Sequence, residues 1–265
     1  MSVVVPANNA ERYISDAIES VLNQTFEDYE LIIVNDGSTD RTEDIILDYQ
    51  KMDPRIIYLK NEENLRICRT LNRGLEAARG DYIARMDADD WSYPARLEKQ
   101  LDYMRNNPDV VLVGSFIHVA DGDMNVLNTR SYPLTDREIR STLLKYSTFA
   151  HPVVMYKRQE ALKCGKYDPS LYDSEDYDFY FRIGRHGKFA NLPETLLKLR
   201  THKKSVSHTR IQRQTLLTLY IKLKAVVEYE YKMSLTDRLY YISHLLGSIL
   251  IPIRIRFWLF NLIRK

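Results

Sequence analysis

Cysteine is scarce in this sequence: Cys68 and Cys164 are the only two among 265 residues, and they lie 96 positions apart. Neither belongs to a CxxC pair or lies near a His cluster, so neither a structural zinc site nor a disulfide framework is indicated. Because unpaired thiols are typical of reducing compartments, the cysteine content predicts a cytoplasmic protein.

Long apolar runs are also absent. The first residues, MSVVVPANNAERYIS, lack the basic segment and apolar stretch of a signal peptide. The longest stretch without formal charge, Leu239–Ile253, has 15 residues and is interrupted by Pro252. A bilayer span needs about 18–20 residues, so we expect no membrane-spanning helix.

The common phosphate-binding patterns are missing as well. No GxGxxG follows the first apolar run, and no GxxxxGK[ST] occurs anywhere. The chain therefore holds phosphate by neither a dinucleotide fingerprint nor a P-loop. It also has no known nucleic-acid-binding motif, and residues 1–199 are acidic, with 25 Lys and Arg against 33 Asp and Glu. We therefore expect no nucleic-acid partner.

What is present is an ordinary globular composition, with 45% hydrophobic and 28% charged residues and a net charge of +2. This composition excludes disorder and collagen, and the length fits one large domain or a domain with an appendage. The charge is unevenly distributed, because residues 200–265 hold 13 Lys and Arg against 3 Asp and Glu. The acidic and basic parts should have different partners.

Apolar strands alternate with amphipathic helices in the first part of the chain. Strands are predicted at 3–6, 30–34, 56–59 and 82–86, with helices at 10–24, 39–52, 66–78 and 94–106. This alternation predicts an α/β fold with a mostly parallel sheet and helices on both faces.

The rhythm changes after residue 106. Strands at 110–119, 153–156 and 196–202, a hairpin arm at 125–132 and helices at 136–146 and 174–186 predict a half that mixes antiparallel strands with helices. Two long helices, at about 206–233 and 234–263, complete the pattern.

Ligands of open α/β sheets bind beyond the carboxyl ends of the strands, so the residues that follow each strand are informative. Asp87, Asp89 and Asp90 place three carboxylates in four positions. They would repel one another unless a hard cation such as Mg²⁺ or Mn²⁺ binds, although a solvated acidic turn or a cap for the next helix would use the same residues.

Asp36 follows the second strand and could accept hydrogen bonds from a base or from sugar hydroxyls. The alternative is a plain turn at Gly37, with Ser38 or Thr39 as the cap of the next helix.

Five segments stand out in order along residues 2–208: VVVPANNAERY from Val3, VNDGSTD from Val34, GDYIARMDADD from Gly80, SEDYD from Ser174, and LRTH from Leu199 with Ser205 and Ser207 after it. Together they resemble the family-2 glycosyltransferases of the GT-A fold, a Rossmann-like nucleotide-binding architecture. Two positions depart from that pattern. Asn8 stands where relatives commonly have Tyr, and Leu65-Arg66 stands where many have Gly after the Asn64 equivalent.

The resemblance implies a nucleotide pocket lined by Pro6, Ala7, Asn9 and Glu11. It further implies that Asp36 binds the base, usually uracil, and that Arg66 reaches the nucleotide. Asp87, with Ala88 beside it, would meet the ribose.

The same resemblance implies that Asp89 coordinates a divalent metal, Mn²⁺ or Mg²⁺, and that His202 completes the coordination. Asp176 would be the catalytic base, with Glu175 oriented to the acceptor sugar. Acidic residues also suit a helix N-terminus whatever their function, and His202 lies beside Lys203 and Lys204 in what could be a solvated strand end. His151 could approach the acceptor or serve only as a turn residue before Pro152.

The predicted organisation is a GT-A catalytic domain at 1–204 and a basic amphipathic helical tail at 205–265. Within the catalytic domain, 1–106 would bind the nucleotide-sugar and 107–204 the acceptor. From Arg238 onward the sequence has five Lys and Arg and no acid, mixed with aromatic and aliphatic residues. Such a segment suits the inner face of the cell membrane, although it could instead pack on the catalytic domain or in a dimer.

The sequence thus predicts an inverting, metal-dependent hexosyltransferase that uses a nucleotide-sugar, most simply a UDP-sugar. Its acceptor would be a saccharide, lipid-linked if the enzyme works at the membrane, in capsule or O-antigen synthesis. Two alternatives stay open: a nucleotidyltransferase, and a non-catalytic, membrane-associated sugar-nucleotide-binding or scaffold protein.

Overall fold

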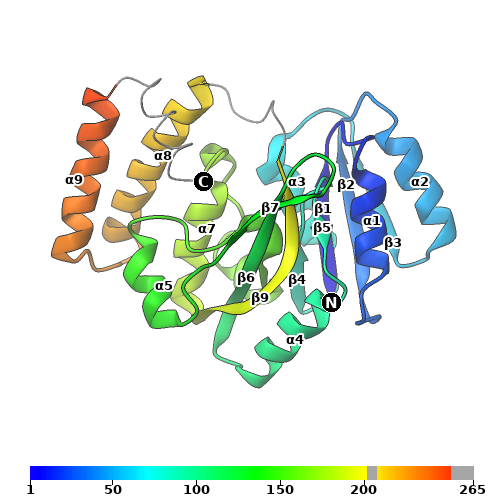
Figure 1. The fold of residues 1–265 in the computed structure, drawn as a ribbon, viewed down its shortest axis with the longest axis horizontal. Helices are drawn as coiled ribbons and strands as arrows, with labels where there is room; N and C mark the ends of the chain where they lie inside the picture. Colours follow the sequence, from blue (N-terminus) through cyan, green and yellow to red (C-terminus); the bar gives the residue numbers. More distant parts are fainter. Residues whose placement is uncertain (202–207, 252–265) are drawn as a thin grey trace.

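The computed structural model describes residues 1–201 and 208–251. Within them, one nine-stranded sheet runs in the order β3-β2-β1-β4-β8-β6-β9-β5 (Figure 1). The remaining strand, β7, pairs with β6 outside this order. The strands are β1 (Ser2–Ala7), β2 (Glu30–Asp36), β3 (Ile56–Asn61), β4 (Tyr82–Arg85), β5 (Trp91–Ser92), β6 (Val110–Ala120), β7 (Val126–Arg130), β8 (Met155–Lys157) and β9 (Lys188–Arg200). The helices are α1 (Ile14–Leu22), α2 (Thr42–Met52), α3 (Arg66–Ala77), α4 (Arg96–Asn106), α5 (Asp136–Leu143), α6 (Arg158–Lys163), α7 (Glu175–Ile183), α8 (His208–Val227) and α9 (Leu235–Leu250).

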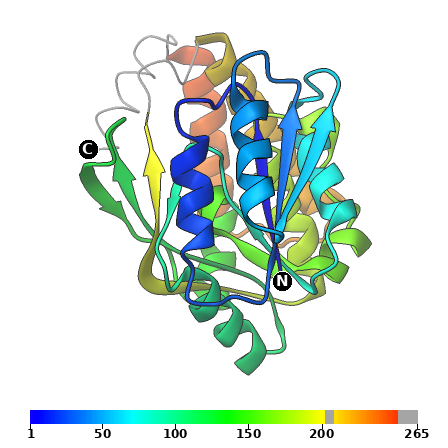
Figure 2. The same ribbon diagram turned by 90° about the vertical axis from the view of Figure 1, so that its right-hand side faces the viewer.

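The first four strands are parallel and covered on both faces, as predicted. Along β1, Val3 and Val5 face the core cluster that includes Ile14 and Ile46 of α1 and α2, whereas Val4 faces the cluster of α3. Figure 2 shows α1 and α2 in front of these strands and the C-terminal helices behind. Burial on both faces explains why the strands are nearly continuous apolar runs. Parallel pairing brings the carboxyl ends of β1, β2 and β4 to one edge.

The second half mixes directions, again as predicted. β8 is antiparallel to β4 and β6, whereas β6 and β9 are parallel. β9 begins at Lys188, eight residues before the predicted start, because its first half pairs with β6 from Val110 onward. Pro193 hides that half in the sequence, since proline is typical of strand breaks; it lies at a shift in register between β6 and β9.

Two short elements were not predicted. β5 has two residues and α6 has six, too few to show a periodic pattern. β5 is nevertheless important for the site, because its antiparallel pairing with β9 brings the end of β9 to the acidic loop after β4.

The two C-terminal helices differ in how they are covered. α8 packs on α7 and buries Leu219, Ile221 and Ala225. α9 packs against α8, at the opposite end of the molecule from α2 (Figure 1), and buries few of its side chains. Among the described residues no helix is both long and apolar enough to cross a membrane. The predicted helix beyond Ile251 lies outside the described residues.

Candidate active site

A hollow of about 450 Å³ opens at the carboxyl edge of β1 and β2, between these strands, the start of α3 and the segment before α7. It is lined by Pro6, Ala7, Asn8, Asp36, Asn64, Arg66, Ile67, Thr70, Asp87, Tyr172 and Asp173. Five of the predicted nucleotide-binding residues therefore come together, namely Pro6, Ala7, Asp36, Arg66 and Asp87. Ala88, beside Asp87, is buried and does not line the hollow.

Asp36 is buried and held firmly in place. Its Oδ1 accepts hydrogen bonds from Asn61 Nδ2 at 2.7 Å and from the backbone N–H of Leu65 at 2.9 Å. The next residue, Gly37, has φ +63°, and a Cβ there would lie 2.6 Å from the backbone nitrogen of Asn64. Glycine thus allows the loop after β2 to touch the loop after β3, which fixes Asp36 at the rim of the hollow.

Asn9 and Glu11 lie outside the lining of this hollow and join two loops instead. Asn9 Oδ1 accepts from the backbone N–H of Thr39 at 2.9 Å, and Glu11 Oε2 accepts from that of Arg41 at 3.0 Å. These bonds tie the loop after β1 to the loop after β2. The nucleotide roles of Asn9 and Glu11 stay predictions.

The predicted helix cap at Ser38 or Thr39 is wrong, because α2 begins only at Thr42. The Ser38 hydroxyl accepts from the backbone N–H of Asn9, so it is used in the loop contact. The backbone N–H of Thr42 is satisfied instead by Asp40 Oδ1 at 3.0 Å.

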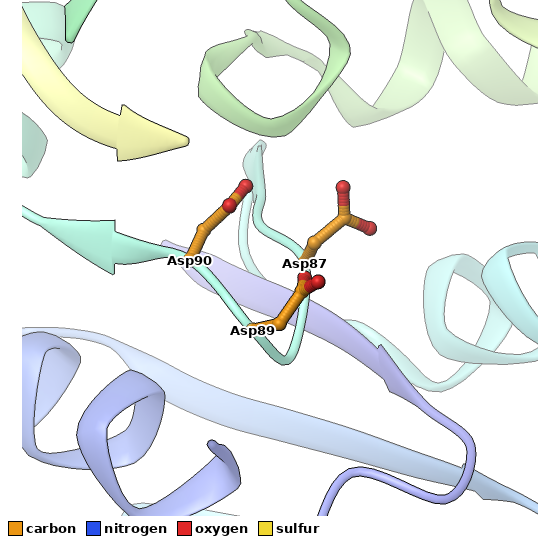
Figure 3. A group of neighbouring side chains, drawn as sticks. All are labelled: Asp87, Asp89 and Asp90. Carbon is orange, nitrogen blue, oxygen red and sulfur yellow. The ribbon is translucent and has the colours of Figure 1, made fainter. Parts of the chain in front are cut away.

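Asp87, Asp89 and Asp90 form a compact acidic cluster on the loop between β4 and β5 (Figure 3). One oxygen from each carboxylate lies within 4.8 Å of the others. Asp90 is only 2% exposed, whereas Asp87 and Asp89 are partly exposed, so a fully solvated turn does not describe the whole cluster. It is not a cap for α4 either, because the backbone N–H of Leu97 in the first turn of that helix donates to Gln24 Oε1 at 3.0 Å. Sequence reasoning noted Asp90 in the acidic run but gave it no role.

Asp90 is only partly satisfied by the protein groups around it. Asp90 Oδ1 accepts from the backbone N–H of Arg200 at 2.9 Å, whereas its buried Oδ2 has no hydrogen-bond partner among the described residues. Burial and the neighbouring charges of Asp87 and Asp89 raise the pKa of Asp90 well above its ordinary value. A buried oxygen without a partner beside two further carboxylates fits a hard divalent cation.

Arg85 is a site residue that sequence reasoning missed. It is 3% exposed and binds Asp87 through both terminal nitrogens, at 2.7 and 2.5 Å. Burial nevertheless raises the pKa of Asp87, with the repulsion of Asp89 added and the attraction of Arg85 opposing it. A single cation at the end of an otherwise apolar strand was the only sequence signal for this pair.

Glu175 and Asp176 are the first two residues of α7. The positive charge of Arg85 acts to lower the pKa of both carboxyl groups. Burial, with the charge of Asp176 added, raises the pKa of Glu175 to about 7, and its buried Oε2 has no hydrogen-bond partner in the described structure. Burial also raises the pKa of Asp176, while Arg85 opposes that rise and Asp87 adds to it. The start of α7 lies close to the acidic cluster, because Tyr172 and Asp173, just before it, line the same hollow as Asp87.

His151 begins a short 3₁₀ helix, His151–Val153, and its Nε2 lies 3.1 Å from the Tyr167 hydroxyl. Burial and the charge of Arg85 lower its pKa well below the ordinary value, so the ring is neutral at neutral pH. His202 lies outside the described residues. The strand that leads to it is anchored by Arg200, whose Nε donates to the backbone oxygen of Asp89 at 2.8 Å.

Comparison with known proteins agrees with this geometry. The family described as glycosyl transferase family 2 matches residues 2–164. An uncharacterized glycosyltransferase of Methanocaldococcus jannaschii is 40% identical over 221 residues, which cover 82% of this chain and 76% of the relative. The O-antigen biosynthesis glycosyltransferase WbnJ of Escherichia coli is 34% identical and covers 80% of this chain and 83% of its own.

Two solved structures share the fold at low sequence identity. S. aureus TarS, residues 1–349, in complex with UDP, has a TM-score of 0.69 at 18% identity and covers 93% of this chain and 70% of its own. The mannosyltransferase PcManGT of Pyrobaculum calidifontis, in complex with GDP-Man and Mn²⁺, has a TM-score of 0.66 at 17% identity, with coverages of 94% and 70%.

The chain belongs to glycosyl transferase family 2, and it is a glycosyltransferase. The predicted GT-A fold, with helices at its C-terminal end, is confirmed.

Proposed function

We propose that this transferase moves a hexose from a UDP-sugar to a saccharide acceptor, with inversion, during assembly of a cell-surface polysaccharide. One observation carries the proposal: the hollow lined by Asp36 and Asp87, the acidic cluster and the Glu175–Asp176 pair meet at one edge of the sheet. WbnJ supports the polysaccharide context by its name, and the UDP bound to TarS supports the donor class.

The nucleotide would occupy the hollow. Asp36, fixed by Asn61 and Leu65, would accept hydrogen bonds from the base, and Arg66 would bring a positive charge to the anionic donor. Asp87, oriented by Arg85, would bind the ribose hydroxyls. Preformed partners of this kind bind a ligand without paying to reorganise the protein.

The acidic cluster would hold Mn²⁺ or Mg²⁺ through Asp89, with Asp87 and Asp90 beside it and His202 as a further ligand. When bound, the metal supplies positive charge that stabilises the departing nucleoside diphosphate. Mn²⁺ in the complex of PcManGT supports this assignment.

Asp176 would act as the base. It removes the proton from an acceptor hydroxyl while that oxygen bonds to the anomeric carbon and the bond from this carbon to the diphosphate breaks. Because a single displacement occurs on the face opposite the leaving group, the configuration inverts. A positioned base contributes about 10²–10⁴-fold to such a step.

Glu175 is suited to a role beside that of Asp176. With a pKa of about 7 it is partly protonated at neutral pH, so it can donate a hydrogen bond to an acceptor hydroxyl as well as accept one. His151, kept neutral by its surroundings, would also contribute to the acceptor side.

We also propose that the enzyme works at the inner face of the cell membrane on a lipid-linked acceptor. On α9 the side chains of Leu235, Leu239, Ile242, Leu246 and Leu250 are exposed. Their spacing of three or four residues puts them on one side of the helix. The sequence after Ile251 adds four Lys and Arg and no acid. An apolar face next to basic residues suits an anionic lipid surface.

The first test is calorimetric titration of the protein with UDP, GDP and TDP, each with Mn²⁺ and with EDTA. We expect metal-dependent binding of UDP; no metal-dependent binding of any nucleotide would refute the proposal. Asp176→Asn should bind UDP as the wild type does but lose turnover. A scaffold protein has no turnover to lose, and a nucleotidyltransferase would require a nucleoside triphosphate.

A separate flotation experiment tests the membrane proposal. The full chain is expected to float with vesicles that contain anionic lipid and to be released by high salt. Binding should weaken in the double variant Leu239→Gln, Leu246→Gln. Equal recovery of variant and wild type would remove α9 from the binding surface.

A further inference from the structure

Tyr172 lies between two arginine side chains that come from distant parts of the chain. The guanidinium carbon of Arg66, at the start of α3, is 4.3 Å from the centre of the tyrosine ring, and that of Arg213, in α8, is 3.4 Å from it. Two guanidinium groups this close to one ring centre would collide on the same face. They must therefore cover opposite faces, which makes Tyr172 the middle of a three-layer stack.

The backbone on both sides of this stack is held in an unusual conformation. Arg66 has φ +67° and Asp173, the residue after Tyr172, has φ +81°, although neither is glycine. At Arg66 the conformation is supported by a hydrogen bond from its N–H to Asn64 Oδ1 at 3.0 Å. Such conformations persist only where the surrounding structure enforces them, and they are typical of ligand sites.

Two members of the stack form a wall shared by two hollows. Arg66 and Tyr172 line the 450 Å³ hollow, and both also line a second hollow of about 370 Å³, together with residues such as Arg69 and Pro169. Tyr172 is only three residues before Glu175, so a change in the wall would move the backbone that enters α7.

We propose that Arg213 is a positioning residue of the transfer site. It covers the outer face of Tyr172 and thereby keeps Arg66 at the nucleotide hollow and fixes the segment that leads to Asp176. This inference rests on the proposed function, since it assigns Arg213 to the donor side of that site. It makes α8 part of the catalytic unit, whereas the sequence boundary at 204 would place it in a separate tail.

The test compares Arg213→Ala with two matched variants in the full chain. Gln214→Ala changes the neighbouring, exposed residue of α8, and Arg213→Lys keeps the charge but loses the planar group that stacks. The probe is UDP with Mn²⁺ in a calorimetric titration, followed by kcat and KM for the donor and the acceptor, and by the thermal midpoint.

Arg213→Ala is expected to weaken UDP binding and raise the donor KM about tenfold, between the values of an exposed and a desolvated cation–π contact. The kcat should also fall, because the segment that leads to Asp176 loses its support, whereas the thermal midpoint should stay unchanged. The UDP affinity and donor KM of Arg213→Lys should lie between those of Arg213→Ala and the wild type. Those of Gln214→Ala should match the wild type. Tyr172→Ala should lose as much UDP affinity as Arg213→Ala. Tyr172→Phe keeps the ring, so it should lose less UDP affinity.

Unchanged UDP binding in Arg213→Ala overturns the inference. So does an equal loss in Gln214→Ala, or a loss of donor binding that appears only together with a lower thermal midpoint. If the wild type itself binds no nucleoside diphosphate, the proposed function fails. If the wild type binds UDP and Arg213→Ala binds it equally well, only the role of Arg213 fails.

Discussion

Asp36 and Asp90 are both buried aspartates at the carboxyl edge of the sheet, yet their surroundings are opposite. Asp36 Oδ1 accepts two hydrogen bonds, from Asn61 and Leu65, and its position is settled by the protein alone. Asp90 has one oxygen without a partner among the described residues and two acidic neighbours. The first arrangement suits a fixed group that recognises a ligand, and the second suits a group completed by a cation.

The difference also has an energetic side. A buried polar group without a partner costs about 1–3 kcal/mol, and repulsion between the three carboxylates adds to that cost. A bound cation would remove both costs, so metal binding and folding should be linked at the Asp90 end and not at the Asp36 end. The following predictions test this contrast.

Asp89→Asn should have the largest effect. Without that carboxylate the cluster would lose both a ligand and a charge, so we expect kcat/KM to fall about 10³-fold and the metal dependence of UDP binding to disappear. Asp123→Asn is the matched control, because Asp123 is exposed on the turn between β6 and β7. Steady-state kinetics measure this effect. A fall in kcat/KM of less than tenfold would argue against a metal at Asp89.

Asp36→Asn should have a smaller and different effect. Asparagine keeps an oxygen that can accept from Asn61 and Leu65, so the loop should keep its shape. The lost charge should weaken UDP binding about tenfold, the usual range for one hydrogen bond to a charged group. Titration with and without EDTA checks this, because Mn²⁺ should enhance binding in this variant as in the wild type. Loss of the metal effect would show that the two ends are not separate.

Mn²⁺ should raise the thermal midpoint of the protein without any nucleotide. At ten times its dissociation constant, the gain should be about 3–5 °C. Asp90→Asn removes one buried charge, so that variant should melt higher than the wild type without metal and gain less from Mn²⁺. Differential scanning calorimetry measures both. An equal gain in the two proteins would remove Asp90 from the cation site.

The positions of the site residues could be predicted from the sequence, but the directions of their side chains could not. The strand ends could be located because strands buried on both faces are nearly pure apolar runs, so Asp36 and the run from Asp87 to Asp90 were placed correctly at one edge. Which way each side chain points could not be predicted. Asn9 and Glu11 bond to the neighbouring loop, a choice made by contacts with residues about thirty positions away.

Long-range packing decided the remaining residues. Arg85 pairs with Asp87 because both lie at the end of β4, and Tyr172 contacts two arginines because α3 and α8 both reach its ring. No local pattern encodes either contact. The start of β9 was missed for the same reason, since its pairing with β6 continues past Pro193 through a register shift.

Glu175→Gln should affect stability only, and in a way that depends on pH. The pKa of Glu175 is raised to about 7 by burial and by Asp176, so in the unfolded chain this carboxyl ionises at lower pH than in the folded one. Below about pH 4 it is protonated in both states and costs nothing. As the pH rises towards 7, the free energy of unfolding falls, because folding must then bury a charge or take up a proton.

Glutamine stays neutral at every pH, so Glu175→Gln should match the wild type at pH 4 and melt about 7 °C higher at pH 8. Thermal melts across that range are the measurement, with the exposed Glu62→Gln as control. Asp90 contributes in the same direction, since its pKa is also raised. The stability of the Glu175→Gln protein should therefore still decline as the pH rises, but less steeply than that of the wild type. A variant that is less stable than the wild type at pH 8 would mean that Glu175 is held as a charged partner of Arg85, and the assignment of proton donor and base on the acceptor side would then be reversed.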